Sequence, residues 1–366
     1  MGASASRVGE AELSSLKIEW YRSPLPPEVS ARVHARSDAR ALLHTAAWVG
    51  LLLGWAAAAQ ACAWSGRPLA AAAFCVLYGL HANFSINAMH ELGHGTAFSS
   101  RTLAAASLRL VSFLGWHHPD LFFSSHRRHH IWTQWAPQDQ ENPMPIRPSL
   151  TGFLSFGFVN VAGAAAAALE TLRAALGVYP TGYLGWLPEW EARIYADDPA
   201  ARAPAARWAW CLLLGHCALA AACVARGAYL LPLCISLGPF HSGWLFWLCN
   251  STQHVGLQPR VPDFRRNSRT FYLHPLLRFL YWNMNYHIEH HMYAAVPFYH
   301  LPALHEAIKH DLPPTPSGIA ECWRIIAEDV RQQALDPGWT QPVALPPPLP
   351  QQQEQAMMAA ESKKSS

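Results

Sequence analysis

Two short histidine motifs in this chain have spacings that suit metal binding, and a third group lies upstream of them. The motif HxxHH occurs twice, and the related motif HELGH occurs once. Their histidines are His90 and His94, then His126, His129 and His130, then His287, His290 and His291. On a helix, residues at i, i+3 and i+4 share one face, so the imidazoles of each motif can point at one place. With 20 His in 366 residues, chance predicts only about 0.06 HxxHH motifs.

A ninth histidine, His254, ends the run Asn250-Ser251-Thr252-Gln253-His254. Nine imidazoles are too many for one ion, because a zinc site takes four ligands and a catalytic one leaves a position open. Neutral imidazole suits iron, zinc and copper, so the ligand type does not choose the metal. We expect two ions with four or five ligands each. Carboxylates that could orient the ring N–H groups are Asp120, Asp139, Glu141 and Asp263.

The composition indicates that membrane helices position these motifs. Only 14% of the residues are charged, 51% are hydrophobic and 16 are Trp, which is typical of a membrane protein. The net charge of +3 does not favour a nucleic-acid partner. Four apolar runs are long enough to cross a bilayer as helices, namely 41–63, 68–89, 208–224 and 228–249. We predict an all-α integral membrane protein with four transmembrane helices in two hairpins and a cytosolic helical cap that holds a histidine-rich dimetal site.

The distribution of basic residues predicts the orientation. Of the 27 Lys and Arg residues, the two predicted hairpin turns hold only Arg67 and Arg226. Since basic residues concentrate on the cytosolic side, both termini and all histidine motifs should face the cytosol. The stretches 103–116 and 150–177 are apolar but interrupted by charges, which favours interfacial or re-entrant helices.

We divide the chain into three parts. Residues 1–41 form a cytosolic N-terminal segment, 42–335 a membrane-embedded domain, and 336–366 a Pro- and Gln-rich tail that we expect to be disordered. The start Met1-Gly2-Ala3-Ser4-Ala5-Ser6 fits the myristoylation pattern with Gly2 as acceptor, although an ordinary N-terminus fits as well. Near the other end, Lys363 and Lys364 resemble a dilysine retrieval signal of the endoplasmic reticulum, or else form a solvated basic tail.

The ordered motifs HELGH, HRRHH and NYHIEHH, with NSTQH before the last, resemble those of the membrane fatty-acid desaturase superfamily. The first motif is HxxxH, a length found in bacterial-type acyl-lipid and sphingolipid desaturases. The resemblance implies that the nine histidines bind two iron ions and that Asn250 contacts the centre through water. It also implies O₂-dependent introduction of a double bond into a fatty acyl chain of an acyl-lipid, a sphingolipid or an acyl-CoA. Because the chain has no HPGG haem motif, electrons should come from a separate donor such as cytochrome b5.

Other functions remain open from the sequence. A hydroxylase or ketolase of the same diiron class would use the same ligands and differ only in substrate placement. His90-Glu91-Leu92-Gly93-His94 also matches the HExxH motif of zinc proteases, in which Glu91 would activate a zinc-bound water. That alternative leaves both HxxHH motifs unexplained. A non-enzymatic metal-binding or transport protein is the remaining class, although transporter histidines usually lie at mid-membrane.

Overall fold

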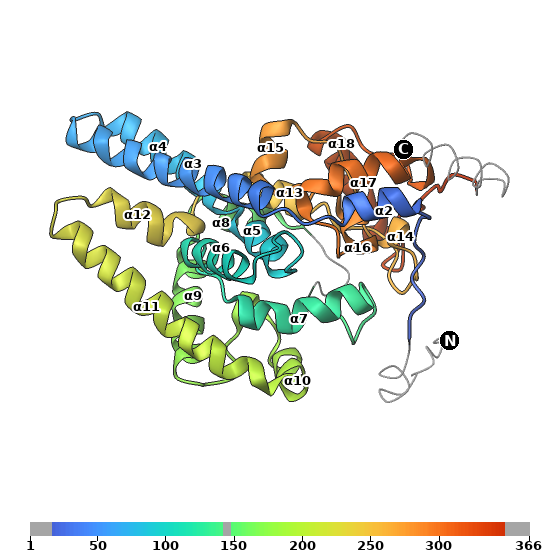
Figure 1. Ribbon diagram of the computed structural model, residues 1–366, viewed down its shortest axis with the longest axis horizontal. Helices are drawn as coiled ribbons and strands as arrows, with labels where there is room; N and C mark the ends of the chain where they lie inside the picture. Colours follow the sequence, from blue (N-terminus) through green and yellow to red (C-terminus); the bar gives the residue numbers. More distant parts are fainter. Residues whose placement is uncertain (1–16, 142–147, 348–366) are drawn as a thin grey trace.

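The computed structural model describes residues 17–141 and 148–347 as an assembly of helices (Figure 1). Within these residues, extended pairing is limited to two isolated bridges, Val159 with His241 and Thr270 with Tyr286. Long helices project to one side of the molecule, and short helices near both termini form a cap on the other side. The prediction of an all-α protein is therefore confirmed.

Three helices of the described residues are long and apolar enough to cross a membrane. They are α3 (Asp38–Trp64), the run Pro68–Gly93 formed by α4 (Pro68–Ala82) and α5 (Ser85–Gly93), and the run Pro199–Val224 formed by η2 (Pro199–Ala201) and α11 (Arg202–Val224). The side chain of Ser37 caps α3 by accepting a hydrogen bond from the Arg40 N–H (3.3 Å). Pro68 starts α4 at a position where its missing N–H is not needed.

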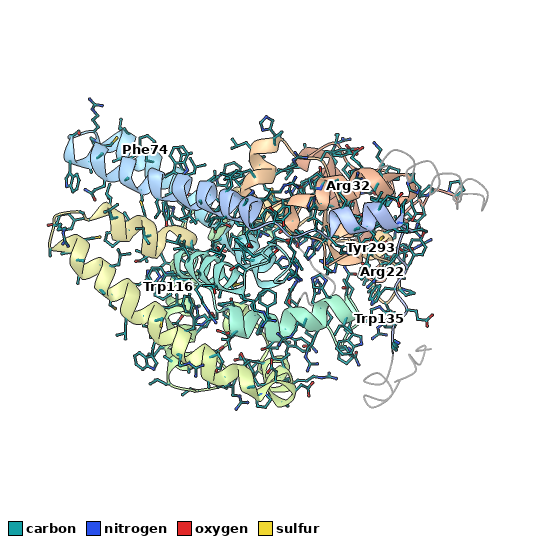
Figure 2. The ribbon with its side chains drawn as sticks, in the orientation of Figure 1. Arg22, Arg32, Phe74, Trp116, Trp135 and Tyr293 are labelled. Atoms are coloured by element: carbon teal, nitrogen blue, oxygen red, sulfur yellow. The ribbon has the colours of Figure 1, made fainter. Side chains whose placement is uncertain are left out.

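The helices α3 and α4 pack along each other as an antiparallel pair (Figure 1). Along α3, Trp48, Leu52 and Ala56 recur every four residues and are fully buried. Leu43 and Leu53 lie on the same helix but are exposed, which suits contact with lipid tails. Phe74 lies near the outer end of this pair, far from the cap (Figure 2).

The predicted fourth crossing, 228–249, is not confirmed, because this stretch does not form one continuous helix. It divides into α12 (Leu230–Leu237), η3 (Gly238–Phe240) and α13 (Trp244–Asn250). Pro239 cannot donate a backbone hydrogen bond, and His241 then adopts an extended conformation (φ −145°, ψ 161°). The Asn83 side chain donates to the freed His241 carbonyl (2.8 Å), so the polar backbone of the break is satisfied inside the protein.

The stretches predicted as interfacial or re-entrant contain α6 (Arg101–Leu114), α8 (Leu150–Gly157) and α9 (Val161–Ala175). Of these, α9 is the longest at 15 residues, short of the about 20 that a crossing needs. It packs against α11 near the middle of the molecule (Figure 1). Its position beside the membrane helices becomes important for the cavity described below.

The cap is formed by short helices from both halves of the chain. They are α2 (Pro27–Val33), α7 (Pro119–Trp132), α10 (Pro188–Asp197), α14 (Phe264–Asn267), α15 (Pro275–Leu280), α16 (His287–Met292), η4 (Phe298–His300), α17 (Leu301–Ile308), η5 (Lys309–Asp311) and α18 (Ile319–Leu335). The turn η1 (Tyr183–Gly185) connects α9 to α10. Cap helices that are distant in sequence therefore pack together, as α2 does with α17.

Residues 20–24, here called the N-terminal strap, bind across the cap. The Trp20 ring stacks on Phe264 with a centroid distance of 4.1 Å. The Tyr21 and Ser23 hydroxyls both donate to Asp311 Oδ2 (2.7 and 2.6 Å). Figure 2 labels Arg22 and Tyr293 in this region, where the Tyr293 hydroxyl donates to the Ser23 carbonyl. The strap ties the start of the chain to the elements around the third histidine motif.

The C-terminal tail begins differently from the prediction. Instead of leaving the body at Asp336, the chain stays against the cap, where Gln341 N–H donates to the Gly256 carbonyl (2.7 Å) and Gln341 Oε1 accepts from Arg269 (2.7 Å). The myristoylation candidate Gly2 and the retrieval-signal candidates Lys363 and Lys364 lie outside the described residues.

Candidate metal centre

Each histidine motif lies on a helix that ends at the cap. His90 is in the last turn of α5, and His94 is the residue that caps its C-terminus. The second motif occupies the last two turns of α7, and the third forms most of the six-residue α16. His254 lies in the turns that follow α13. The helical spacing predicted from the sequence thus turns the imidazoles of each motif toward one interior space.

The nine histidines converge in two neighbouring groups. In each group, every ring contributes one nitrogen atom, and these nitrogen atoms all lie within 4.8 Å of one another. The first group is His90, His94, His126, His130 and His290, and the second is His129, His254 and His291. His287 joins the second group, since its Nε2 atom is 2.9 Å from His254 Nε2 and 3.1 Å from His291 Nε2. The groups are adjacent, because the His130 and His291 ring centroids are 4.6 Å apart.

Carboxylates and a carbonyl hold the outer nitrogen of four of these rings. His90 Nδ1 lies 2.9 Å from Glu91 Oε1, and His126 Nδ1 lies 2.8 Å from Glu141 Oε1. His129 Nδ1 lies 2.8 Å from Asp139 Oδ2, and His254 Nδ1 lies 2.8 Å from the Asn267 carbonyl. Each partner is an acceptor, so the ring proton is on Nδ1 and the Nε2 lone pair faces the interior.

Inward lone pairs at such close range need a cation between them. His126 Nε2 is 2.9 Å from His130 Nε2, which is 3.2 Å from His290 Nε2. A neutral imidazole has one N–H, so three converging Nε2 atoms cannot all be satisfied by hydrogen bonds to one another. His94 Nε2 is buried without any partner among the described residues. Two metal ions would satisfy both groups, so the donor set fits a dimetal centre, and imidazole ligands suit iron.

Burial keeps most of these rings in the form that binds metal. It lowers the pKa of His126, His130 and His291 well below the usual range, and neighbouring imidazoles lower it further. Metal ligation requires neutral imidazole, so the site is prepared for binding. His129 differs: burial lowers its pKa, but Asp139 outweighs this effect and raises the pKa to about 9, so a metal ion must displace the proton on its Nε2 in order to bind there.

Glu91 has a structural role that the sequence did not reveal. Its Oε1 atom lies 2.9 Å from His90 Nδ1 and 3.2 Å from His290 Nδ1, so one carboxylate connects the first and third motifs. Its side chain is 1% exposed. A protease base must face a water at the open position of a zinc ion, whereas this carboxylate points at the outer nitrogens of two rings. The geometry therefore disfavours the zinc-protease alternative.

Glu289 anchors the third motif from behind. It is fully buried, accepts a hydrogen bond from the Thr270 hydroxyl (2.5 Å) and also contacts His305 Nδ1. The Thr270 hydroxyl in turn accepts from the Ile288 N–H (3.1 Å). These bonds fix a helix that has too few residues to be stable alone.

Two carboxylates that looked suitable in the sequence, and two histidines outside the motifs, do not join the two groups. Asp120 pairs with Arg109 (2.7 Å) and Asp263 with Arg265 (2.8 Å), so neither orients a ring of the two groups. His118 instead bonds the Thr171 hydroxyl (3.0 Å). His44 packs against the rings of Phe279, Trp282 and Phe298. Asp139 and Glu141 differ from the other carboxylates because the segment after α7 folds back along this helix and brings them to His129 and His126, only 10 and 15 positions away in sequence.

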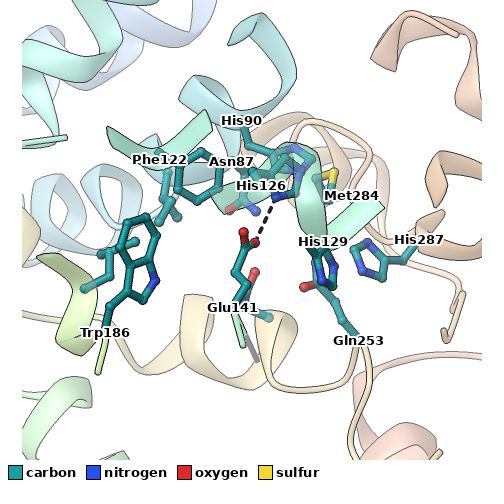
Figure 3. Close-up of a pocket in the computed structure, with 13 residues that line it drawn as sticks. Asn87, His90, Phe122, His126, His129, Glu141, Trp186, Gln253, Met284 and His287 are labelled. Atoms are coloured by element: carbon teal, nitrogen blue, oxygen red, sulfur yellow. Dashed lines mark hydrogen bonds and ion pairs between the residues drawn. The ribbon is translucent and has the colours of Figure 1, made fainter. Parts of the chain in front are cut away.

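A small cavity of about 180 Å³ opens directly beside the two groups (Figure 3). Figure 3 shows His90, His126, His129 and His287 lining it together with Glu141. Asn250 and Gln253, from the end of α13 and the turn after it, also line it. This position of Asn250 is compatible with a contact through water.

A larger cavity of about 500 Å³ adjoins the small one, because Ile86, Leu184 and Asn250 line both. Its walls are mostly apolar and include Trp116, Phe156, Phe240 and Phe246. One side is the face of α9 that carries Gly163, Ala166 and Ala167. Apolar space of this size is sufficient for part of a lipid chain.

Helices long and apolar enough to cross a membrane, nine converging imidazoles (the imidazole cage) and a neighbouring apolar cavity together define a histidine-rich membrane protein whose site fits metal ions. A comparison with protein-family models matches residues 66–323, well over half of the chain, to the family described as fatty acid desaturase. The chain belongs to this family, which implies an oxidoreductase. A comparison with curated protein sequences gives no significant match.

Proposed function

We propose that this protein is an O₂-dependent diiron desaturase that introduces a double bond into a fatty acyl chain of a lipid. The observation that carries the proposal is the apolar cavity that adjoins the small cavity beside the imidazole cage. When bound, two iron ions would supply the redox chemistry with O₂ that removes hydrogen from unactivated C–H bonds. We assign His90, His94, His126, His130 and His290 to one ion and His129, His254, His287 and His291 to the other.

The residues of the chain would hold and orient the reactants. The apolar walls of the larger cavity would bind the acyl chain and exclude water, while Ile86 and Leu184 would direct it from one cavity into the other. Asn250, at the same junction, would hold a water beside the metal ions. Glu91, Glu141 and Asp139 would keep the ring protons on Nδ1 and so keep the inner nitrogens available.

The cellular setting is part of the proposal. We infer that the protein lies in the endoplasmic-reticulum membrane with both termini and the metal centre on the cytosolic side, because of the basic residues only Arg67 and Arg226 fall in the opposite turns. Since three crossing helices alone would leave the termini on opposite sides, this orientation requires α12, η3 and α13 together to return the chain to the cytosolic side. Electrons would come from a separate protein such as cytochrome b5. Hydroxylation or ketone formation is the second candidate, since the same cage serves either outcome and substrate placement decides between them.

Lipid profiling by mass spectrometry tests the proposal. Cells that express the chain should contain lipids lighter by two hydrogens that are absent from cells with the His290→Ala form. Products heavier by one oxygen would instead identify a hydroxylase. The iron content of the purified protein provides the second measurement. Zinc in place of iron, with no lipid product, would refute the proposal.

Filling the larger cavity should block the substrate without disturbing the metal site. Ala167 lies on the cavity face of α9, so Ala167→Phe places a ring where the acyl chain would bind. We expect turnover of a long-chain lipid to fall at least about tenfold while iron content stays unchanged. The matched control is Ala165→Phe, which makes the same change on the exposed face of the same helix. Equal turnover in the two variants would show that the substrate does not use this cavity.

A further inference from the structure

The larger cavity has mostly apolar walls, and Glu170 is the one acidic residue among the described residues that line it. Glu170 follows Gly163, Ala166 and Ala167 on the same face of α9 and lines the cavity with them. The Leu184 backbone N–H lowers the pKa of its carboxyl group, and no side chain of the described residues forms a hydrogen bond or ion pair with it. Burial raises the pKa of Glu170 to about 7, which the Leu184 N–H and Arg173 only partly offset. A carboxylate here would be stabilised by another hydrogen-bond donor.

The other polar groups of the cavity add no positive charge. His117 lines the cavity and contacts the Ser85 hydroxyl through Nε2 (2.9 Å). Burial lowers the pKa of His117 to about 3, so this ring is neutral. Asn160 uses its side-chain oxygen to cap α9 at Gly163 (2.8 Å). Neither Lys nor Arg is among the described residues that line the cavity.

These groups select the kind of molecule that can be accommodated. An anionic head group would bring a negative charge beside Glu170 with no lysine or arginine on the cavity wall to compensate it. A purely apolar chain would leave the Glu170 carboxylate with a single backbone donor. A hydroxyl or an amide N–H would donate to this carboxylate and remain uncharged.

We infer that Glu170 binds an uncharged hydrogen-bond donor, a hydroxyl or an amide N–H, of the lipid whose acyl chain reaches the metal centre. This inference rests on the proposed function and deepens it, because it names the substrate class. Lipids with such a donor are favoured over lipids that present a carboxylate or a phosphate to this cavity. Glu170 is thus a specificity-determining residue that acts at a distance from the metal ligands.

Binding measurements on the purified, iron-loaded full-length chain test the inference. The probes are 1-hexadecanol, its methyl ether, which lacks the donor, and hexadecanoate, which is anionic. Isothermal titration calorimetry in one detergent gives the dissociation constants. We expect hexadecanol to bind about tenfold more tightly than the ether, the value for one hydrogen bond to a charged group, and also more tightly than hexadecanoate.

Variants assign this preference to one side chain. Glu170→Leu should reduce the ratio of hexadecanol affinity to ether affinity to about one. Glu189→Leu, on the exposed surface of α10, should leave this ratio unchanged. If Glu170→Leu does not fold, Glu170→Gln provides the test. Its amide oxygen still faces the Leu184 N–H but carries no charge, so the ratio of hexadecanol affinity to ether affinity should fall to about two or three. An unchanged ratio in the folded Glu170 variant, or hexadecanoate binding as tight as hexadecanol, would overturn the inference.

The binding assay does not depend on turnover, so the two proposals can fail separately. A preference that depends on Glu170 in a protein that produces no desaturated lipid would refute the proposed reaction and leave the binding site in place. Desaturated products from a protein with no preference for hexadecanol would refute the inference and leave the reaction in place.

Discussion

Replacing His290 by alanine should halve the iron content and abolish turnover. Its Nε2 atom lies 3.2 Å from the Nε2 atom of His130, which belongs to the same group of five histidines. Its Nδ1 atom lies 3.2 Å from Glu91 Oε1. The variant therefore loses one proposed ligand and also the contact that connects the first and third motifs. Loss of a group that only orients a ligand costs about 10–100-fold in metal affinity or activity, so loss of a ligand should cost about 100-fold or more. Iron per chain, measured by elemental mass spectrometry, and product yield are the two measurements.

The matched control for His290 is an exposed histidine. His274 lies on the surface, where its ring caps α15 by accepting from the Leu276 N–H (3.3 Å). His274→Ala should keep two irons and most of the activity. If both variants lose iron equally, the assignment of His290 to the metal centre is wrong. If His290→Ala still binds two iron ions, the assignment of His290 as a metal ligand is likewise wrong.

Removing the Asp139 side chain should empty the second group of metal. This carboxylate lies 2.8 Å from His129 Nδ1 and also accepts from the backbone N–H groups of Gln134 (2.8 Å) and Glu141 (3.0 Å). Asp139→Ala frees the His129 ring to rotate and leaves two backbone donors unpaired, at about 1–3 kcal/mol each. We expect a 10–100-fold loss of iron affinity and a lower melting temperature. Metal titration and thermal unfolding measure the two effects.

Two further variants separate the two roles of Asp139, which orients the His129 ring and also binds the backbone of the segment after α7. Asp139→Asn keeps an oxygen for one of the two backbone N–H groups, which bind different carboxylate oxygens, and removes the negative charge. Stability should therefore recover in part, and by more than iron affinity does. Asp120→Ala removes a carboxylate that looked equally suitable in the sequence but pairs with the partly exposed Arg109. A pair of this kind contributes about 0–1 kcal/mol, and iron binding should be nearly unchanged. Similar iron loss from Asp120→Ala and Asp139→Ala would contradict the assigned role of Asp139.

The sequence predicted those parts of the site that depend on local periodicity. The spacing of His126, His129 and His130 places three rings on one helical face, whatever the rest of the chain does. The division of nine rings into two groups depends on how α5, α7 and α16 pack, and that packing joins residues more than 150 positions apart. No local pattern contains this information. Asp139 could not be distinguished from Asp120 for a different reason: its contact with His129 depends on the conformation of the irregular segment after α7, which has no periodic pattern in the sequence.

The fold was predicted less fully where hydrophobicity was the main signal. Apolar composition correctly indicated α3 and the run Pro68–Gly93 as membrane helices. It also suggested one helix over 228–249, because hydropathy does not register that Pro239 lacks a backbone donor. The break is stabilised by Asn83, a residue on another helix. The contact of Glu91 with two histidine motifs could not be predicted for a similar reason, since His290 is about 200 positions away in sequence.

The N-terminal strap has a consequence for the order in which this protein folds. Tyr21 and Ser23 precede their shared partner Asp311 by about 290 positions, so they are synthesised well before it. Trp20 likewise waits for Phe264, whose ring stacks on His291 with a centroid distance of 5.4 Å. Contacts so distant in sequence form late, because the intervening chain must first be ordered. During synthesis, residues 20–24 therefore remain without these partners until Phe264 and Asp311 have been made, so the strap binds the cap only after the third histidine motif has emerged.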